Sequence, residues 1–372
     1  MKFNTPIQIG KLEIKNRVFL APLAGVSDIP FRRICQELGA GLTYVEMLSS
    51  VAIKYNSKRT FQMMDRHKSE SILGVQVTGG NAADVAAAVT VLDKQGFETI
   101  DINMGCPVRK VVSAGCGSAI LKDPERITDT VLQCRSATQK PLSAKFRLGY
   151  TREQINVDNT VDRVVSSHVD MFTIHGRTRS ESYSTPCDYS GIKLGLDVAV
   201  KKQSSVVKVG NGDIFDFKTA QKMYAETGCD AVMVSRGALG NPWIFAEILA
   251  EKSVQPSIEE WFDVVCRHLD YQKEYFGDTK LAAILMRKHL LWYAKGFPNS
   301  KGARNILNQV ESLEQAKEVL LNFKNEVPAH FVRFEGFGIE PVAENQNSSD
   351  YDPKYEMDRT LDRGVGDDGL PS

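Results

Sequence analysis

The sequence predicts an α/β protein that consists of a (β/α)8 barrel, a small all-helical domain and an acidic, disordered tail. Two observations indicate this fold class. Eight short β-rich segments recur along the first 240 residues, each followed by a segment with helical spacing, and from about Gln255 helical patterns continue without strands. The strand-like segments start about 24 to 43 residues apart, which suits a strand, a covering helix and two loops. A doubly wound open sheet is the alternative, but its repeats would stop at five or six.

The eight expected strands would form the inner wall of the barrel. They are VFLAPL from Val18, LTYVEM from Leu42, ILGVQVTG from Ile72, TIDINMGC from Thr99, LSAKFRLG from Leu142, MFTIHGRT from Met171, VVKVGNGD from Val206 and AVMVSRGA from Ala231. Helices should follow them. Asp28 can cap a helix after the first strand that ends at Gly39 or Gly41, and Asn81 or Asp84 can cap the helix after the third.

The C-terminal part of the chain divides into two regions. Three helices are expected in IEEWFDVVCRHLDYQKEYF, LAAILMRKHLLWYAK and SLEQAKEVLLNF, so we place a barrel at 1–254 and a helical domain at 255–325. Residues 326–372 contain 11 acidic and 4 basic residues, and most of this segment is polar and rich in turn formers. Such a composition cannot bury enough apolar surface to fold, so we expect a disordered tail.

Composition excludes several classes of protein. No run of about 18 apolar residues exists, so no membrane span is expected. The N-terminus lacks an apolar segment after its one lysine, so we expect no secretory signal and a cytoplasmic location. The seven cysteines are scattered, without CxxC or a Cys/His cluster at zinc spacing, so neither disulfides nor a bound metal is expected.

Polar residues occupy the C-terminal ends of the expected strands, where barrels of this kind place their chemistry. These ends are Pro22-Leu23-Ala24, Glu46, Gln76, Asn103 to Pro107, Lys145, Arg147, His175 to Arg177, Asn211 to Asp213, and Ser235 to Gly237. The last two strands end in GNGD and SRG, glycine-bearing loops at the position where barrels commonly bind phosphate through backbone N–H groups. Either loop alone could be only a tight turn, but both together favour a phosphate-bearing ligand, to which Arg236 can add a charge-assisted contact.

Three further strand-end residues indicate chemistry. Cys106 follows the fourth strand, and a thiol of ordinary pKa is mostly protonated at neutral pH, so it can act as a general acid; a buried cysteine without function is the alternative. Lys145 and Arg147 alternate onto one face of a strand, and if that face is inward they need an anionic ligand. His175 is either a strand-mouth site residue or a core histidine.

Six ordered segments resemble the tRNA-dihydrouridine synthases, and within them the bacterial B-type branch. They are FLAPLAGVSDIPFRR, INMGCP with VRKVVSAGCGSAIL, SAKFRLGY, FTIHGRTR, VGNGDI and VMVSRGALGNPWIF, and RKHLLWYAKGFP resembles the family's C-terminal RNA-binding domain. The resemblance spans the barrel and the helical region up to about Asn325.

The resemblance implies an FMN enzyme that uses NADPH to reduce the C5–C6 double bond of a D-loop uridine in tRNA, with hydride from flavin N5 to C6 and a proton from Cys106 to C5. It implies that the flavin is bound by Pro22, Leu23, Ala24, Gln76, Lys145 and His175. It implies that the ribityl phosphate is bound by Asn211, Gly212, Asp213, Ser235 and Arg236. The base would be held by Asn103 with Arg147 or Arg177.

A basic, aromatic-rich helix independently suggests RNA binding. Between Lys280 and Arg304 there are six basic residues and no acidic one, interleaved with aromatic residues. Lys288, Trp292 and Lys295 would share one helical face and contact tRNA through phosphate and stacking interactions. A merely solvated basic face is the alternative. We expect a monomer.

Two rival functions stay open at this point. One is an FMN barrel that acts on a free pyrimidine, such as a dihydroorotate or dihydropyrimidine dehydrogenase, although such an enzyme needs no basic helical domain. The other is a noncatalytic tRNA-binding protein, because a fold alone does not fix function. The sequence does not identify which uridine is reduced, whether NADPH is preferred over NADH, the oligomeric state, or the role of the tail.

Overall fold

A computed structural model of the chain describes residues 2–298 and 300–328. Nearly all of the acidic segment that we expected to be disordered therefore lies outside the described residues. Among those described, no helix is long and apolar enough to cross a membrane.

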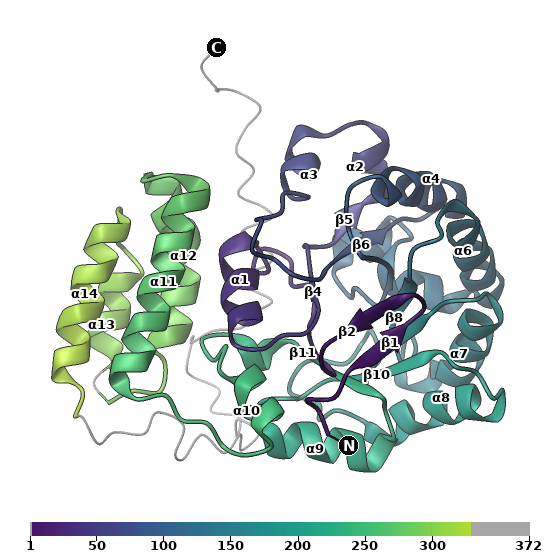
Figure 1. Cartoon of the computed structure of the whole chain (residues 1–372). Helices are drawn as coiled ribbons and strands as arrows, with labels where there is room; N and C mark the ends of the chain where they lie inside the picture. The colour runs from purple at the N-terminus through teal and green to yellow at the C-terminus, as the bar shows by residue number, and fades with distance from the viewer. Residues whose placement is uncertain (1, 299, 329–372) are drawn as a thin grey trace.

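Eight parallel strands form a nearly closed barrel (Figure 1). They are β3 (Val18–Leu20), β4 (Thr43–Tyr44), β6 (Leu73–Thr78), β7 (Thr99–Met104), β8 (Leu142–Arg147), β9 (Met171–His175), β10 (Val207–Asn211) and β11 (Ala231–Val234). β3 pairs with β11, and on its other side Leu20 N–H donates to the Leu42 carbonyl at 2.9 Å. First and last strands thus meet, which confirms the barrel and makes the open-sheet alternative wrong.

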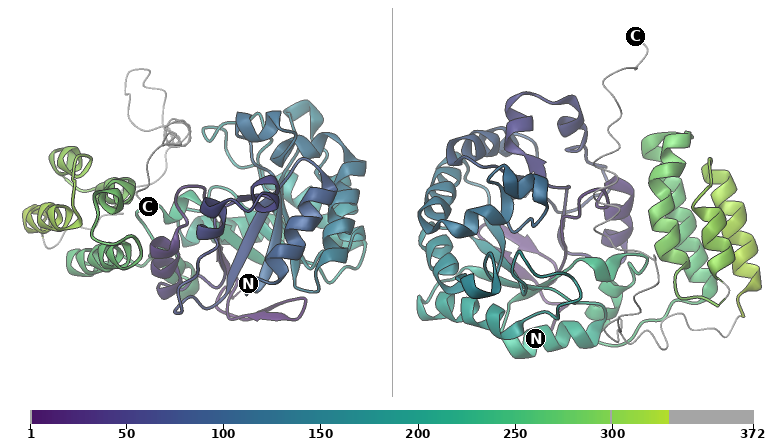
Figure 2. Two further views of the ribbon diagram at one scale, coloured as in Figure 1. Left: turned by 90° about the horizontal axis from the view of Figure 1, so that it is seen from above. Right: turned by 180° about the vertical axis from the view of Figure 1, so that it is seen from behind.

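Helices cover the outside of the barrel (Figures 1 and 2). They include α1 (Ile29–Glu37), α4 (Ala82–Asp93), α6 (Pro124–Ala137), α7 (Val157–Ser166), α8 (Tyr189–Lys201), α9 (Phe217–Thr227) and α10 (Ile244–Ala250). The Asp28 side chain caps α1 by accepting from Phe31 N–H at 3.1 Å. Asn81, rather than Asp84, caps α4. A side-chain acceptor at the N-cap satisfies an N–H that the helix leaves unpaired.

Several short elements were not expected from the sequence. An antiparallel hairpin of β1 (Ile7–Ile9) and β2 (Leu12–Ile14) packs Ile9 and Ile14 against barrel residues such as Phe19. Others include β5 (Leu48–Ser49), which pairs with β6, and the helices α2 (Ser50–Lys54), α3 (Lys58–Gln62) and α5 (Arg109–Ser113). Each is too short to leave a clear periodic pattern.

The helical domain contains α11 (Ile258–Phe276), α12 (Lys280–Ala294), α13 (Ser300–Leu307) and α14 (Leu313–Glu326), and α13 was missed in the sequence. A capping box between Ser257 and Glu260 begins α11. The domain has its own apolar core, which also takes in Ile34 of α1 and Trp243. α11 packs on α1, so the domain lies beside the barrel (Figure 2).

Helix α12 differs from the exposed basic face that we expected. His289, Trp292 and Tyr293 are 1%, 8% and 0% exposed, because they pack between the barrel and α11. The helix ends at Ala294, so Lys295 is an exposed C-cap in extended conformation and lies off the helical face of Lys288. The prediction of one helical face shared by Lys288, Trp292 and Lys295 was therefore wrong, while the contact of these residues with tRNA stays a prediction.

Candidate active site

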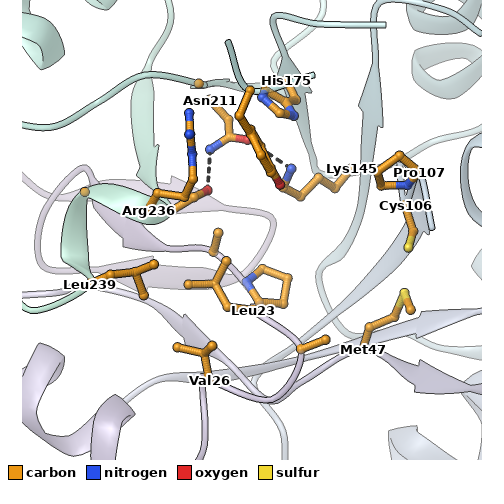
Figure 3. Close-up of a pocket in the computed structure, with 18 of the residues that line it drawn as sticks. Leu23, Val26, Met47, Cys106, Pro107, Lys145, His175, Asn211, Arg236 and Leu239 are labelled. Carbon is orange, nitrogen blue, oxygen red and sulfur yellow. Dashed lines mark hydrogen bonds between the residues drawn. The ribbon is translucent and has the colours of Figure 1, made fainter. Parts of the chain in front are cut away.

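A single pocket at the C-terminal ends of the strands gathers the residues singled out in the sequence (Figure 3). All of the predicted site residues except Lys295 line it. They are Pro22, Leu23, Ala24, Gln76, Asn103, Cys106, Lys145, Arg147, His175, Arg177, Asn211, Gly212, Asp213, Ser235, Arg236, Lys288 and Trp292. The last two come from α12, so the helical domain completes the wall of a barrel pocket.

The pocket also has an apolar wall that sequence reasoning missed. Val26, Met47, Tyr183, Phe215 and Leu239 belong to it. Figure 3 shows Met47 beside Cys106, whereas Leu239 and Arg236 lie at the opposite side. Met47 directly follows Glu46 at a strand end, so the rule that selected Glu46 could have found it. The others lie on loops without a recognisable pattern.

Lys145 projects from β8 into the pocket, and a chain of polar groups orients it. Its ammonium donates to Asn211 Oδ1 at 3.1 Å. The Asn211 amide in turn donates to the Met233 carbonyl at 2.7 Å and to Ser235 Oγ at 3.0 Å, which fixes the orientation of the amide. Burial, together with the neighbouring Arg147, lowers the pKa of Lys145 to about 8. A ligand with negative charge near the Lys145 ammonium would therefore stabilise its charged form.

Asp213 is the centre of an ion-pair network at the end of β10. Its carboxylate accepts from Arg177 at 2.6 and 2.8 Å, from Arg236 at 2.8 Å, and from Cys187 N–H at 2.9 Å. The carboxylate is thus engaged with protein groups. An anion bound at this segment would contact Arg236 and the backbone N–H groups of the turn.

That turn has the backbone shape of an anion-binding loop. Gly212 and Asp213 have φ angles of +126° and +49°. Successive residues outside the usual backbone regions can present their N–H groups to a common point. On the neighbouring loop, a Cβ added to Gly237 would lie 2.1 Å from the Ile214 carbonyl oxygen, so only glycine lets the two loops pack together.

The two arginines proposed for base binding have different surroundings. Arg177 is 1% exposed and donates to Asp213, to the Thr185 carbonyl and toward His175, so its guanidinium is fully engaged in the ion-pair network. Arg147 donates to the Gly105 carbonyl at 2.9 Å and to the Thr178 carbonyl at 2.7 Å. It therefore braces the loop that carries Cys106.

The Cys106 loop is held from both sides. Asn103 Oδ1 accepts from the N–H groups of Gly105 at 3.0 Å and Cys106 at 2.9 Å. Ser118 donates to the Cys106 carbonyl through its hydroxyl at 2.8 Å. Burial raises the pKa of the Cys106 thiol, partly offset by a backbone hydrogen bond at Val108 and by Arg147. The thiol therefore stays protonated at neutral pH.

Asp101, which sequence reasoning missed, lies beneath this loop in the barrel interior. It accepts from Ser143 Oγ at 2.5 Å and from the Gln76 amide at 2.7 Å. Gln76 Oε1 then accepts from the Asn103 amide at 2.8 Å. One carboxylate thus orients two successive side-chain amides, and the second of them orients Cys106. Burial raises the pKa of Asp101 to about 6.

The charge of the pocket is predominantly positive. The lining includes Lys145, Arg147, Arg177, Arg236 and Lys288, against the carboxylate of Asp213. Burial lowers the pKa of His175 well below its usual value, as do the charges of Arg147, Lys145, Arg177 and Arg236, so its imidazole is neutral. The apolar wall and the cationic end suit a planar, anionic ligand. The protonated thiol suits a second molecule that accepts a proton.

The model of a protein family matches most of the sequence of this chain. The profile described as "Dihydrouridine synthase (Dus)" matches residues 19–328, from the first barrel strand to just beyond α14. The chain belongs to the dihydrouridine synthase family. The resemblance drawn from the six sequence segments is confirmed.

Individual relatives of the dihydrouridine synthase family agree with this assignment. The tRNA-dihydrouridine synthase B of Pasteurella multocida is 34% identical over 324 residues, which cover 86% of this chain and 96% of the relative. The protein of the same name from Escherichia coli is 33% identical over 319 residues, covering 84% and 98%.

Solved structures with low sequence identity share the fold alone. A histamine dehydrogenase from Rhizobium sp. 4-9 has a TM-score of 0.55 at 12% identity, covering 88% of this chain and 65% of that one. The 6-hydroxypseudooxynicotine amine oxidase of Pseudomonas geniculata N1 has a TM-score of 0.53 at 14% identity, covering 72% and 52%. The chain thus spans about half to two thirds of the length of these structures.

Proposed function

We propose that this dihydrouridine synthase reduces the C5–C6 double bond of a D-loop uridine in tRNA. The observation that carries the proposal is the position of Cys106, whose backbone N–H is held by Asn103 and whose thiol lies in the same pocket as the cationic end of the barrel. The names of relatives that align over nearly their full length support tRNA as the substrate.

Family membership implies a flavin, and the residues present fit FMN. The turn at Gly212 and Asp213, with Arg236 beside it, would hold the phosphate through N–H groups and a guanidinium. Pro22, Leu23 and Ala24 would contact the ring system and Gln76 its pyrimidine edge. The Lys145 ammonium and the neutral His175 would lie near its negative end. When bound, the flavin supplies hydride, received from NADPH, to C6 of the base.

Protein side chains supply the proton and the positioning. Cys106 donates a proton to C5, which is feasible because burial keeps the thiol in its acid form. Asn103 holds the base as well as the Cys106 loop, with Arg147 as the arginine nearer to that loop. Arg177 contributes indirectly, since it holds Asp213 and through it Arg236.

The helical domain, 255–325, would bind the tRNA and bring the uridine to the pocket. Lys288 and Trp292 line the pocket from α12, so a nucleotide that enters it passes along this helix. A uridine must leave its stack to reach a barrel interior, and a second domain that holds the RNA makes this feasible. A monomeric state and a cytoplasmic location stay predictions.

An anaerobic reoxidation experiment tests the proposed function. Purified protein is reduced with NADPH, and flavin reoxidation is followed after adding tRNA from cells that lack the modification, with uracil and dihydroorotate as controls. We expect rapid reoxidation by tRNA alone. Reoxidation only by a free pyrimidine would indicate a small-molecule dehydrogenase, and a colourless protein that binds tRNA would indicate a noncatalytic one.

A further inference from the structure

Three side chains from both domains converge outside the active-site pocket. Asp28 caps α1 of the barrel, His268 lies on α11 and His289 on α12. One potential ligand atom from each lies within 4.8 Å of the other two. Both histidines are at most 1% exposed. The cluster therefore lies inside the contact between the barrel and the helical domain.

The two imidazoles leave ring nitrogens without a partner. His289 Nδ1 and Nε2 and His268 Nε2 are buried and make no hydrogen bond to any residue that the structure describes. A buried polar atom without a partner costs about 1 to 3 kcal/mol, so three of them in one cluster call for a ligand. His268 Nδ1 is engaged, because it lies 3.0 Å from the Tyr293 hydroxyl.

We propose that Asp28, His268 and His289 bind a divalent cation of the zinc class, which joins the barrel to the helical domain. Two imidazole nitrogens and one carboxylate oxygen are a common protein ligand set for Zn²⁺, with water as the fourth ligand. The hydrogen bond between His268 Nδ1 and Tyr293 is the outer-sphere contact that orients a histidine whose other nitrogen binds metal.

Each residue reaches the cluster in a form suited to a metal. The imidazole rings of His268 and His289 lie 4.8 Å apart, centroid to centroid, so a nitrogen of each can reach one ion. Asp28 accepts from Phe31 N–H through Oδ1, which leaves Oδ2 for an ion.

Two features shape the expected affinity. Ligand atoms that share a zinc ion lie roughly 3.3 Å apart, so side-chain rotation must draw the three donors closer together on binding. The Lys288 ammonium lowers the pKa of all three groups, which shows that its charge reaches the cluster and would oppose a cation. Lys288 donates to the Gly25 carbonyl, which holds the ammonium toward the pocket. We therefore expect a structural site, independent of the reduction reaction.

No sequence pattern predicts this site, and from the sequence we expected that the protein binds no metal. The three residues lie at positions 28, 268 and 289, and they meet because α1 packs against α11 and Phe31 of α1 contacts His289 of α12. Ring contacts surround the cluster: Phe31 lies 5.1 Å from His289 and 6.0 Å from His268, centroid to centroid. Apolar ring surface therefore borders the cluster on the α1 side.

The test uses untagged, full-length protein. Its zinc content is measured as purified, then again after chelator treatment and titration with Zn²⁺ in competition with a chromogenic chelator. Co²⁺ substitution gives an absorption spectrum that reports the ligand geometry. We expect about one ion per chain and a higher thermal unfolding temperature with Zn²⁺. A wild-type protein that binds no Zn²⁺ even on titration would overturn the proposal.

Variants locate the ion. Asp28→Asn removes the carboxylate but keeps a good N-cap for α1, so it should fold and bind Zn²⁺ at least roughly 10- to 100-fold more weakly. His268→Gln should also lose affinity and the Co²⁺ spectrum. His67→Gln is the matched control, since His67 contacts Glu274 of α11 at the same domain boundary but outside the cluster. Equal Zn²⁺ binding by Asp28→Asn and His268→Gln would show that the ion lies elsewhere and refute the assignment.

Discussion

The backbone N–H of Cys106 donates to the side-chain oxygen of Asn103 at 2.9 Å. This bond ends a chain that begins at Asp101 and passes through the amides of Gln76 and Asn103. An amide can turn over and exchange its oxygen and nitrogen, and an acceptor at position 101 reinforces the orientation in which the Asn103 oxygen faces the N–H groups of Gly105 and Cys106. The position of the thiol therefore depends on a carboxylate in the barrel interior.

Replacing the thiol should stop proton delivery without unfolding the protein. For Cys106→Ala we expect turnover to fall by about 10²- to 10⁴-fold, the usual contribution of a general acid, with flavin content unchanged. Single-turnover flavin reoxidation by tRNA measures it. Cys266→Ala, a half-buried thiol on α11, is the control and should behave as wild type. Unchanged reoxidation in Cys106→Ala would eliminate the thiol as the acid.

The pH dependence of the same step follows from the thiol. Burial raises the Cys106 pKa above its ordinary value, so the acid form persists through neutral pH and is lost only as pH rises above the usual cysteine range. The single-turnover rate should therefore stay constant through neutral pH and decline on the alkaline side. This decline should be absent in Cys106→Ala. A decline centred below pH 7 would contradict the assignment.

Two substitutions of Asp101 should separate orientation from charge. In Asp101→Asn the amide oxygen can still accept from Gln76, while the Ser143 hydroxyl can switch from donor to acceptor. Asp101→Leu removes the acceptor altogether. We expect Asp101→Asn to retain turnover within about tenfold and Asp101→Leu to lose it to the level of Cys106→Ala. The alkylation rate of Cys106 provides a second readout. Equal effects of both substitutions would mean that charge, rather than orientation, matters.

Asp101 should also affect stability against pH. Its folded-state pKa of about 6 exceeds the value of 3.8 for an exposed aspartate, so the folded protein binds the proton more tightly. The free energy of unfolding should fall by up to about 3 kcal/mol as pH rises from about 4 to about 6. The attraction between Lys145 and the ionised Asp101 makes this fall smaller. In chemical denaturation at several pH values, Asp101→Asn should lack this contribution. If the free energy of unfolding varied with pH in the same way in wild type and Asp101→Asn, this contribution of Asp101 would be refuted.

Arg236 should affect flavin affinity more than folding. It is partly exposed, lies beside the Gly212–Asp213 turn, and its charge-assisted contact with a phosphate is worth about 1.5 to 3 kcal/mol. Arg236→Ala should therefore weaken FMN binding about 10- to 100-fold, measured by flavin fluorescence on reconstitution. Arg152→Ala, an exposed arginine outside the pocket lining, should have no effect. Equal affinities would exclude Arg236 from phosphate binding.

Lys288 and Lys295 form a matched pair for tRNA binding. Lys288 lines the pocket, whereas Lys295 is an exposed residue after the end of α12. Lys288→Ala should weaken tRNA binding and reduce the salt dependence of affinity by about one phosphate contact, while flavin content stays the same. Lys295→Ala should change little. The reverse order would place the RNA on the outer side of the helical domain.

The barrel and most of its pocket could be predicted because strand ends carry both the fold and the chemistry. Polar residues such as Lys145 and Asn211 interrupt apolar strands, and this contrast is visible without a structure. Asp101 was missed because it precedes the strand end, although strand alternation places it on the same face as Asn103. Helix α12 was misjudged because it is buried on two sides, so His289 and Tyr293 serve packing while Trp292 borders the pocket.

Lys288 and Trp292 belong to one domain and line a pocket whose floor belongs to the other. A chimera that takes its helical domain from a relative would therefore inherit part of its active-site wall from that relative. Exchanging the RNA-binding module cannot alter only the choice of uridine, because the same helix borders the space around the reacting groups. Any graft that preserves turnover must carry compatible side chains at these two positions.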